Sequence, residues 1–173
     1  MQSIKQKNDQ FKGMTKKEKA VAVAKDVLKH LRSLKFTGCA SYCEGDGLNI
    51  SKDENVQPHI SKLVKNCEVC ALGGMFLSYI RLFDNVKYEK IIEPKYYEEN
   101  EYQIHVDRDY IIDKFKGIFD RDVLDCIEDA YEGGWDEFYP DPRDRIKAIM
   151  KNIVKNNGRF IDDLDNVEED EVW

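Results

Sequence analysis

Four cysteines in the first half of the chain have the spacing that most suggests chemistry. Cys39 and Cys43 form a C-x3-C pair, and Cys67 and Cys70 follow as a C-x2-C pair after 23 intervening residues. Two short pairs on separate elements can supply four thiolates to a tetrahedral zinc ion. Cys70 also opens a strongly apolar stretch, where a reduced thiol behaves as a small core residue. The pattern therefore leaves two interpretations, a zinc site or buried free thiols, and we expect no other cofactor.

A second candidate site is an aromatic and arginine-rich segment in the last third of the chain. It contains Trp135, Tyr139, Arg143 and Arg145. Tryptophan, tyrosine and arginine dominate binding hot spots, and the helix expected to start at Pro142 offers backbone N–H groups to an anion. The same segment can be an ordinary loop between two helices that packs onto the core. Both interpretations stay open at the level of sequence.

The remaining ionisable residues form no recognisable catalytic constellation. The carboxylates around residues 107–120 are explained by solvated helix faces and helix caps, and Cys126 falls on the apolar side of its helix. Leu72-Gly73-Gly74 lacks the lysine and hydroxyl residue of a phosphate-binding loop. The sequence therefore leaves catalysis open and favours a protein that is not an enzyme.

The elements that position these residues are mainly helical. Thr15 and Glu18 form a capping box before a helix of about 20 residues with apolar side chains at three- and four-residue spacing. Residues 67–83 are apolar nearly all round, which predicts a central buried helix, and Gly73 and Gly74 within it indicate close packing.

Shorter segments between the helices favour extended backbone. Residues 36–50 predict short extended pieces with a turn at Glu44–Gly47, and residues 86–104 predict a strand or arm with an excursion at Pro94. Later helices are expected to end at Gly133–Gly134 and at Asn157–Gly158. The fold class that follows is α+β, mainly α, a compact helical domain with a small β-hairpin or short sheet.

Charge is distributed unevenly along the chain. Residues 1–35 carry a net charge of +7, residues 162–173 carry −7, and the whole chain carries −7. The basic start fits a solvated helix face, so we expect no direct nucleic-acid binding. We expect residues 1–13 to be a flexible N-terminal extension, residues 14–161 a single globular domain, and residues 162–173 an acidic tail.

The sequence shows neither a transmembrane segment nor a secretory signal. No run of 18 apolar residues occurs, and the N-terminus lacks the apolar region of a secretory signal. An odd number of cysteines in such a chain fits reduced thiols. We therefore expect a cytoplasmic protein without a membrane partner, and the sequence leaves open whether it forms a homo-oligomer.

Two strings carry a resemblance to known proteins. The string CALGGMF at residues 70–76 resembles the C-A-x-G-A-hydrophobic helix of small uncharacterised bacteriophage proteins, with Gly74 where that pattern often has alanine. The string DRIKAIMKNIVKNNGRF at residues 144–160 is similar to a helix near their C-terminus. The resemblance spans roughly residues 15–160. It implies a phage setting, in the cytoplasm of an infected bacterium, and an accessory role in host takeover or counter-defence.

Three functions are compatible with these observations. We expect an accessory protein that binds a host or defence protein, or that sequesters a small anionic, nucleotide-type signal. The first alternative is a small metal- or thiol-dependent hydrolase of such a signal. The second is an acidic DNA mimic that competes for a DNA-binding protein.

Overall fold

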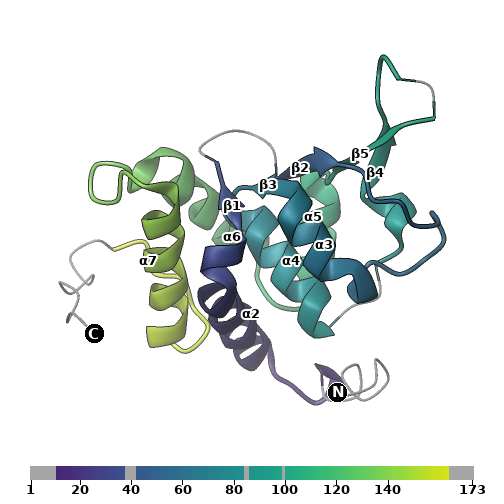
Figure 1. The fold of residues 1–173 in the computed structure, drawn as a ribbon. Coiled ribbons are helices and arrows are strands. Elements are labelled where there is room, and N and C mark those ends of the chain that lie inside the picture. Colours follow the sequence, from purple (N-terminus) through teal and green to yellow (C-terminus); the bar gives the residue numbers. More distant parts are fainter. Residues whose placement is uncertain (1–10, 38–41, 84–85, 99, 164–173) are drawn as a thin grey trace.

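The computed structural model describes residues 11–37, 42–83, 86–98 and 100–163 (Figure 1). Its α-helices are α2 (Lys16–His30), α3 (Ile60–Asn66), α4 (Ala71–Phe83), α5 (Arg108–Phe115), α6 (Arg121–Asp129) and α7 (Pro142–Lys155). Its strands are β1 (Lys35–Phe36), β2 (Cys43–Asp46), β3 (Cys67–Val69), β4 (Ile92–Pro94) and β5 (Tyr102–His105). Short 3-10 turns lie at Leu31–Ser33, Gln57–His59 and Tyr88–Lys90, and a π-helical turn, η4, spans Ala130–Gly134. The α+β, mainly α fold class is confirmed.

The five strands form one mixed sheet in the order β1-β3-β2-β5-β4. β1 is parallel to β3, and the other neighbours are antiparallel. Side chains alternate across the sheet, so Cys43, Cys67 and Val69 face the core while Glu44 and Glu68 face solvent. The sheet therefore has one covered face and one open polar face.

Helix α2 begins where the capping box predicts. The Thr15 side chain accepts a hydrogen bond from the Glu18 backbone N–H, and the Glu18 carboxylate accepts one from the Thr15 backbone N–H at 2.7 Å. The apolar side of α2 is fully buried against α4 and α7. Phe11, inside the predicted N-terminal extension, stacks on Phe83 with ring centroids 4.2 Å apart, so the packed chain extends at least to Phe11.

Helix α4 is the centre of the core, as its all-round apolar sequence predicts. Eleven of its 13 residues are buried. A Cβ on Gly73 would lie 1.3 Å from the Tyr42 carbonyl oxygen, and one on Gly74 would lie 3.1 Å from the Phe36 ring. Because Tyr42 precedes β2, the glycine at position 73 lets the sheet approach the helix closely.

Two local predictions are wrong. Residues 67–69 form strand β3 rather than the first turn of the central helix, because they pair with β1 and β2. Residues 44–46 belong to strand β2 and not to a turn, because they pair with β3 and β5. In both places the pairing partner lies far away in the sequence, so local composition did not reveal it.

The connections between the later elements follow the expected signals. α7 starts at Pro142 after the Asp141 cap, and it ends before Asn157 and Gly158, both of which have positive φ. α6 passes directly into the turn that contains Gly133–Gly134. None of the helices in the described ranges is long and apolar enough to cross a membrane.

Candidate binding surface

The connection between β4 and β5 is an arm that projects from the open end of the sheet (Figure 1). We call the described residues of this connection, 95–98, 100 and 101, the arm. Tyr96 and Tyr97 within it are 90% and 93% exposed, and their ring centroids lie 4.9 Å apart in an edge-on arrangement. No other large apolar or aromatic side chain of the described residues is so exposed.

The arm has a defined shape because it closes on itself. The Lys95 backbone N–H donates to the Glu101 carbonyl at 3.0 Å, and the Glu101 N–H donates to the Glu98 carbonyl at 3.2 Å. Asn100 adopts φ 66°, the left-handed conformation that asparagine tolerates in turns. The Lys95 ammonium lies within 4 Å of carboxylates on Asp46, Glu98 and Glu101, and the hydrogen bond to Glu101 raises the pKa of Lys95.

Charged side chains cover the open face of the sheet next to the arm. Strand register places Lys35, Glu68, Glu44 and His105 in one row across β1, β3, β2 and β5. A second row crosses β2, β5 and β4, in which Gln103 lies between two acidic residues, Asp46 and Glu93. A hollow of about 370 Å³ lies on this face, lined by the following residues: Lys35, Thr37, Glu44, Gly45, Asp46, Asn66, Glu68, Lys95 and Gln103.

The aromatic and arginine-rich segment predicted as a site lies elsewhere, and two of its four predicted residues, Trp135 and Arg145, are buried. Trp135 is 1% exposed, and its indole Nε1 donates to Asp162 at 2.9 Å. Arg145 is 6% exposed, and its guanidinium donates to the carbonyls of Tyr131, Tyr139 and Pro140.

The other two predicted residues of that segment lie nearer the surface. Tyr139 is half-buried, with its ring centroid 6.2 Å from that of Trp135. Arg143 is exposed and reaches the Leu34 carbonyl at 3.5 Å. This arrangement matches the second interpretation of the segment, a loop packed onto the core.

Three of the four candidate zinc ligands, Cys43, Cys67 and Cys70, are buried in the core. The Cys67 thiol donates to the Leu63 carbonyl at 2.9 Å, and its hydrogen bond with Cys43 raises the pKa of the Cys43 thiol. Burial raises the pKa of Cys70 to about 12. Among the described residues no group of three metal-binding side chains is placed to hold an ion. Cys39 lies outside the described residues, so the four-cysteine zinc site stays a prediction.

Cys126 was expected in the core, and that prediction is wrong because the residue is exposed on α6. The residues on the inner side of that helix are Leu124, Ile127 and Glu128. The buried Glu128 takes part in a polar cluster that sequence reasoning missed.

That cluster joins three distant parts of the chain. The Glu128 carboxylate accepts hydrogen bonds from the Tyr42 hydroxyl and from Arg108 Nε, the latter at 2.8 Å, and Arg108 also reaches Asp125. Burial, together with the bond to Glu128, raises the pKa of Tyr42. Burial and the neighbouring carboxylates raise the pKa of Glu132. The cluster ties α5 and α6 to the segment before β2, and no sequence signal pairs these residues.

Comparison with known proteins found no match. No protein-family model, no curated protein and no solved structure matches the chain.

Proposed function

We propose that this protein is a binding protein that contacts a protein partner through Tyr96 and Tyr97 on the arm. The exposure of these two rings carries the proposal. A tyrosine buries a large apolar ring in an interface at little cost in side-chain entropy, and it keeps a hydroxyl for hydrogen bonding. Two adjacent rings at the tip of a shaped arm therefore suit a hot spot.

The charge around the arm indicates the chemistry of the partner. Among the described residues, the arm and the rows of side chains on the adjoining sheet face carry six carboxylates and two lysines. The carboxylates are on Glu44, Asp46, Glu68, Glu93, Glu98 and Glu101, and the lysines are Lys35 and Lys95. Such a surface attracts a positively charged protein surface and repels phosphate. A protein partner is therefore favoured over a nucleotide-type signal.

The buried thiols favour binding over catalysis. A cysteine acts as a nucleophile only as a thiolate. The raised pKa values of Cys43 and Cys70 keep both thiols protonated at neutral pH. If the resemblance to phage accessory proteins holds, the expected partner is a host or defence protein of the infected cell.

A photo-crosslinking experiment tests the proposal. A benzophenone amino acid replaces Tyr96, Tyr97 or, as a matched control, Phe138, which is 61% exposed on another loop. We expect one and the same partner to be captured from positions 96 and 97 in infected cells and not from position 138. The same adducts from all three positions would contradict the proposal.

The affinity of the captured partner gives the second measurement. Replacing both tyrosines with alanine should weaken binding by about 100-fold or more, because two hot-spot residues contribute roughly 2 kcal/mol each. Thermal unfolding of the variant should match that of the parent, since the rings contact little of the fold. An unchanged affinity would remove the arm from the interface.

A DNA mimic is a second candidate, favoured by the acidic rows on the sheet face. Glu44 and Glu68 lie directly opposite each other on β2 and β3, and like charges at such a position repel. A DNA-binding partner would show strongly salt-dependent binding and would be displaced by duplex DNA. Binding that is insensitive to both would exclude mimicry and leave the arm proposal intact.

A further inference from the structure

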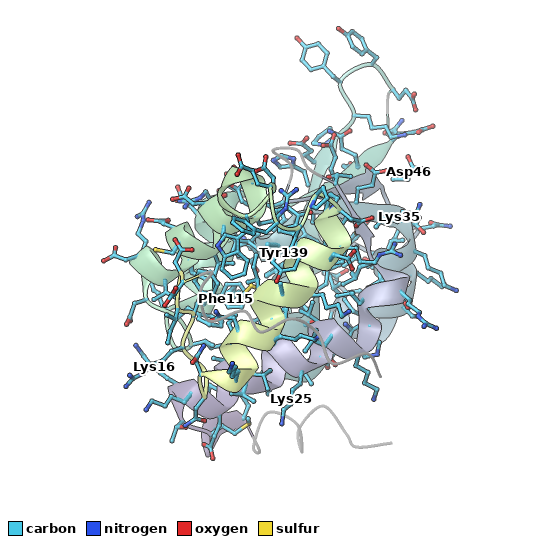
Figure 2. All side chains as sticks on the ribbon, turned by 90° about the vertical axis from the view of Figure 1, so that its left-hand side faces the viewer. Lys16, Lys25, Lys35, Asp46, Phe115 and Tyr139 are labelled. Carbon is cyan, nitrogen blue, oxygen red and sulfur yellow. The ribbon has the colours of Figure 1, made fainter. Side chains whose placement is uncertain are left out.

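The hollow on the open face of the sheet adjoins the arm. Lys95 is the first residue of the arm and also lines the hollow, and its ammonium lies 3.6 Å from the carboxylate of Asp46, another residue of the lining. Figure 2 shows Asp46 and Lys35, which also lines the hollow, on one side of the molecule near the base of the projecting arm. A partner that contacts Tyr96 and Tyr97 therefore lies within reach of the hollow.

The described lining of the hollow is rich in hydrogen-bond acceptors. Glu44, Asp46 and Glu68 contribute three carboxylates. The amide nitrogen of Gln103 donates to Glu93, and because the two ends of an amide point in different directions, its carbonyl oxygen faces away from Glu93. A group that carries several donors and no acceptor matches such a lining.

The two lysines of the lining leave it acidic. Lys95 is shared between Asp46 and two glutamates of the arm, all within 4 Å of its ammonium. Strand register places Lys35 beside Glu68, but no ion pair joins these two residues in the part of the chain that the structure describes. The hollow therefore favours a positively charged occupant.

The end of helix α3 adds negative charge that does not come from a carboxylate. Asn66, the last residue of α3, lines the hollow. A Cβ on Gly45 would lie 2.0 Å from the Asn66 carbonyl oxygen, so the glycine lets the end of α3 lie directly against β2. The C-terminal end of a helix carries partial negative charge on its free carbonyl groups, which also favours a cation.

We propose that the hollow receives an arginine side chain of the partner, an inference that rests on the proposed role of the arm in partner binding. A guanidinium has five N–H donors and no acceptor, and it stays charged at neutral pH. Its planar fork can donate to two carboxylates, such as those of Glu44 and Glu68, which lie opposite each other on β2 and β3. The volume of about 370 Å³ is small for a ligand site and suits a single side chain.

The arm and the hollow then contribute different parts of recognition. Tyr96 and Tyr97 supply apolar contact area, which many partners could use. The hollow selects among those partners, because a surface without an arginine would cover the carboxylates and leave them without a donor. The partner must therefore present an arginine beside the patch that contacts the two rings.

An NMR titration of the whole chain tests the hollow without the partner. The probe is N-acetyl-arginine amide, and its matched control is N-acetyl-citrulline amide, which has nearly the same shape and no charge. We expect saturable shifts of the amide signals of residues 44–46, 66–68 and 103 with the arginine probe, smaller shifts with N-acetyl-lysine amide and none with the citrulline compound. Equal shifts with all three probes, or arginine-induced shifts that do not centre on these residues, would overturn the proposal.

A pair of variants makes the titration specific. Glu68→Gln should weaken binding of the arginine probe by about tenfold, because it removes one charged acceptor. Glu137→Gln, which neutralises an exposed glutamate on another loop, should leave the affinity unchanged. The Glu68 variant should stay folded, since Glu68 lies opposite Glu44 and like charges at such a position repel. Equal affinities for both variants and the parent would contradict the proposal.

The affinity of the captured partner separates this inference from the proposed function. Glu68→Gln should weaken partner binding by about tenfold, and Glu137→Gln should not change it. Unchanged binding for the Glu68 variant, beside a large loss for the variant without both tyrosines, would overturn the hollow and leave the arm in place. The reverse result would support the hollow and overturn the proposed function of the arm.

Discussion

Two aromatic segments of this protein have similar composition but differ in the burial of their aromatic rings. Residues 135–140 read Trp-Asp-Glu-Phe-Tyr-Pro, and residues 94–98 read Pro-Lys-Tyr-Tyr-Glu. The first buries Trp135 at 1% exposure, while the second leaves both of its tyrosines at 90% or more. Aromatic content next to acidic residues therefore does not decide whether a segment packs or projects.

The difference lies in what holds each backbone. The loop around Trp135 is held by Arg145, which donates to three carbonyls of residues 131–140 from inside the fold. The arm makes its backbone hydrogen bonds within residues 95–101. A segment tied to a buried cation is pulled inward, whereas a segment closed on itself can stand away from the core.

Removing the Trp135 side chain should have the largest effect on stability. Trp135→Ala leaves a cavity beside Phe160 and loses the hydrogen bond to Asp162, so we expect a loss of about 3–5 kcal/mol in the free energy of unfolding. Urea denaturation measures it. Phe138→Ala, in the same loop but exposed, should change stability by less than about 0.5 kcal/mol. Equal losses would mean that the loop does not depend on its buried ring.

Removing the Arg145 guanidinium, which holds the loop, should cause the second-largest loss of stability. Arg145→Met keeps much of the buried volume but leaves three carbonyls without their donor, so we expect a loss of about 2–3 kcal/mol. Arg143→Met is the matched control, because that side chain is exposed and its hydrogen bond to the Leu34 carbonyl is long, at 3.5 Å. The loss of stability should stay below about 1 kcal/mol. Similar losses for the two variants would contradict the role given to Arg145.

The buried thiols should make stability depend on pH. Cys70 has its pKa raised to about 12 in the folded chain, from an ordinary value of 9.0. Below pH 9 the thiol is protonated in both states and contributes no pH dependence. Above pH 9 the unfolded thiol ionises while the folded one does not, so stability falls as pH rises toward 12, by up to about 1.4 kcal/mol per pH unit.

A comparison of variants isolates that contribution. The slope of unfolding free energy against pH between 9 and 12 should be shallower for Cys70→Ala than for the parent chain. Cys126→Ala, which removes an exposed thiol, should leave the slope unchanged. The same slope in all three proteins would rule out Cys70 as its source.

Local patterns in the sequence were enough to predict the helical part of the fold. The Thr15–Glu18 capping box, the proline at position 142 and the Asn157–Gly158 terminator each act within a few residues, and each lies where it was predicted. The close packing indicated by Gly73 is also confirmed. Such signals can be identified from the sequence because each of them satisfies or terminates backbone hydrogen bonds of the same helix.

The sheet and the candidate site depend on contacts between distant residues, and there the predictions were weaker. Residues 67–69 are too few to show a two-residue period, and they merge with the apolar helix that follows. The pairing of Arg108 with Glu128, 20 residues apart, follows from the packing of α5 on α6 and from no local rule. Residues 86–104 were predicted to be extended with an excursion at Pro94. The exposure of Tyr96 and Tyr97 follows from backbone hydrogen bonds that close the arm on itself, among Lys95, Glu98 and Glu101, and no local composition indicated them.

The smallest effect on stability should come from the arm itself. Tyr96→Ala with Tyr97→Ala should change the free energy of unfolding by less than about 0.5 kcal/mol, because exposed rings lose little on truncation. Replacing residues 95–101 with Asn-Gly, the usual two-residue turn between antiparallel strands, should keep β4 paired with β5. Urea denaturation of both variants measures this. A loss of 2 kcal/mol or more would show that the arm packs like the Trp135 loop. Unchanged stability would mean that the aromatic rings of the arm do not serve the fold, as their proposed role in partner binding requires.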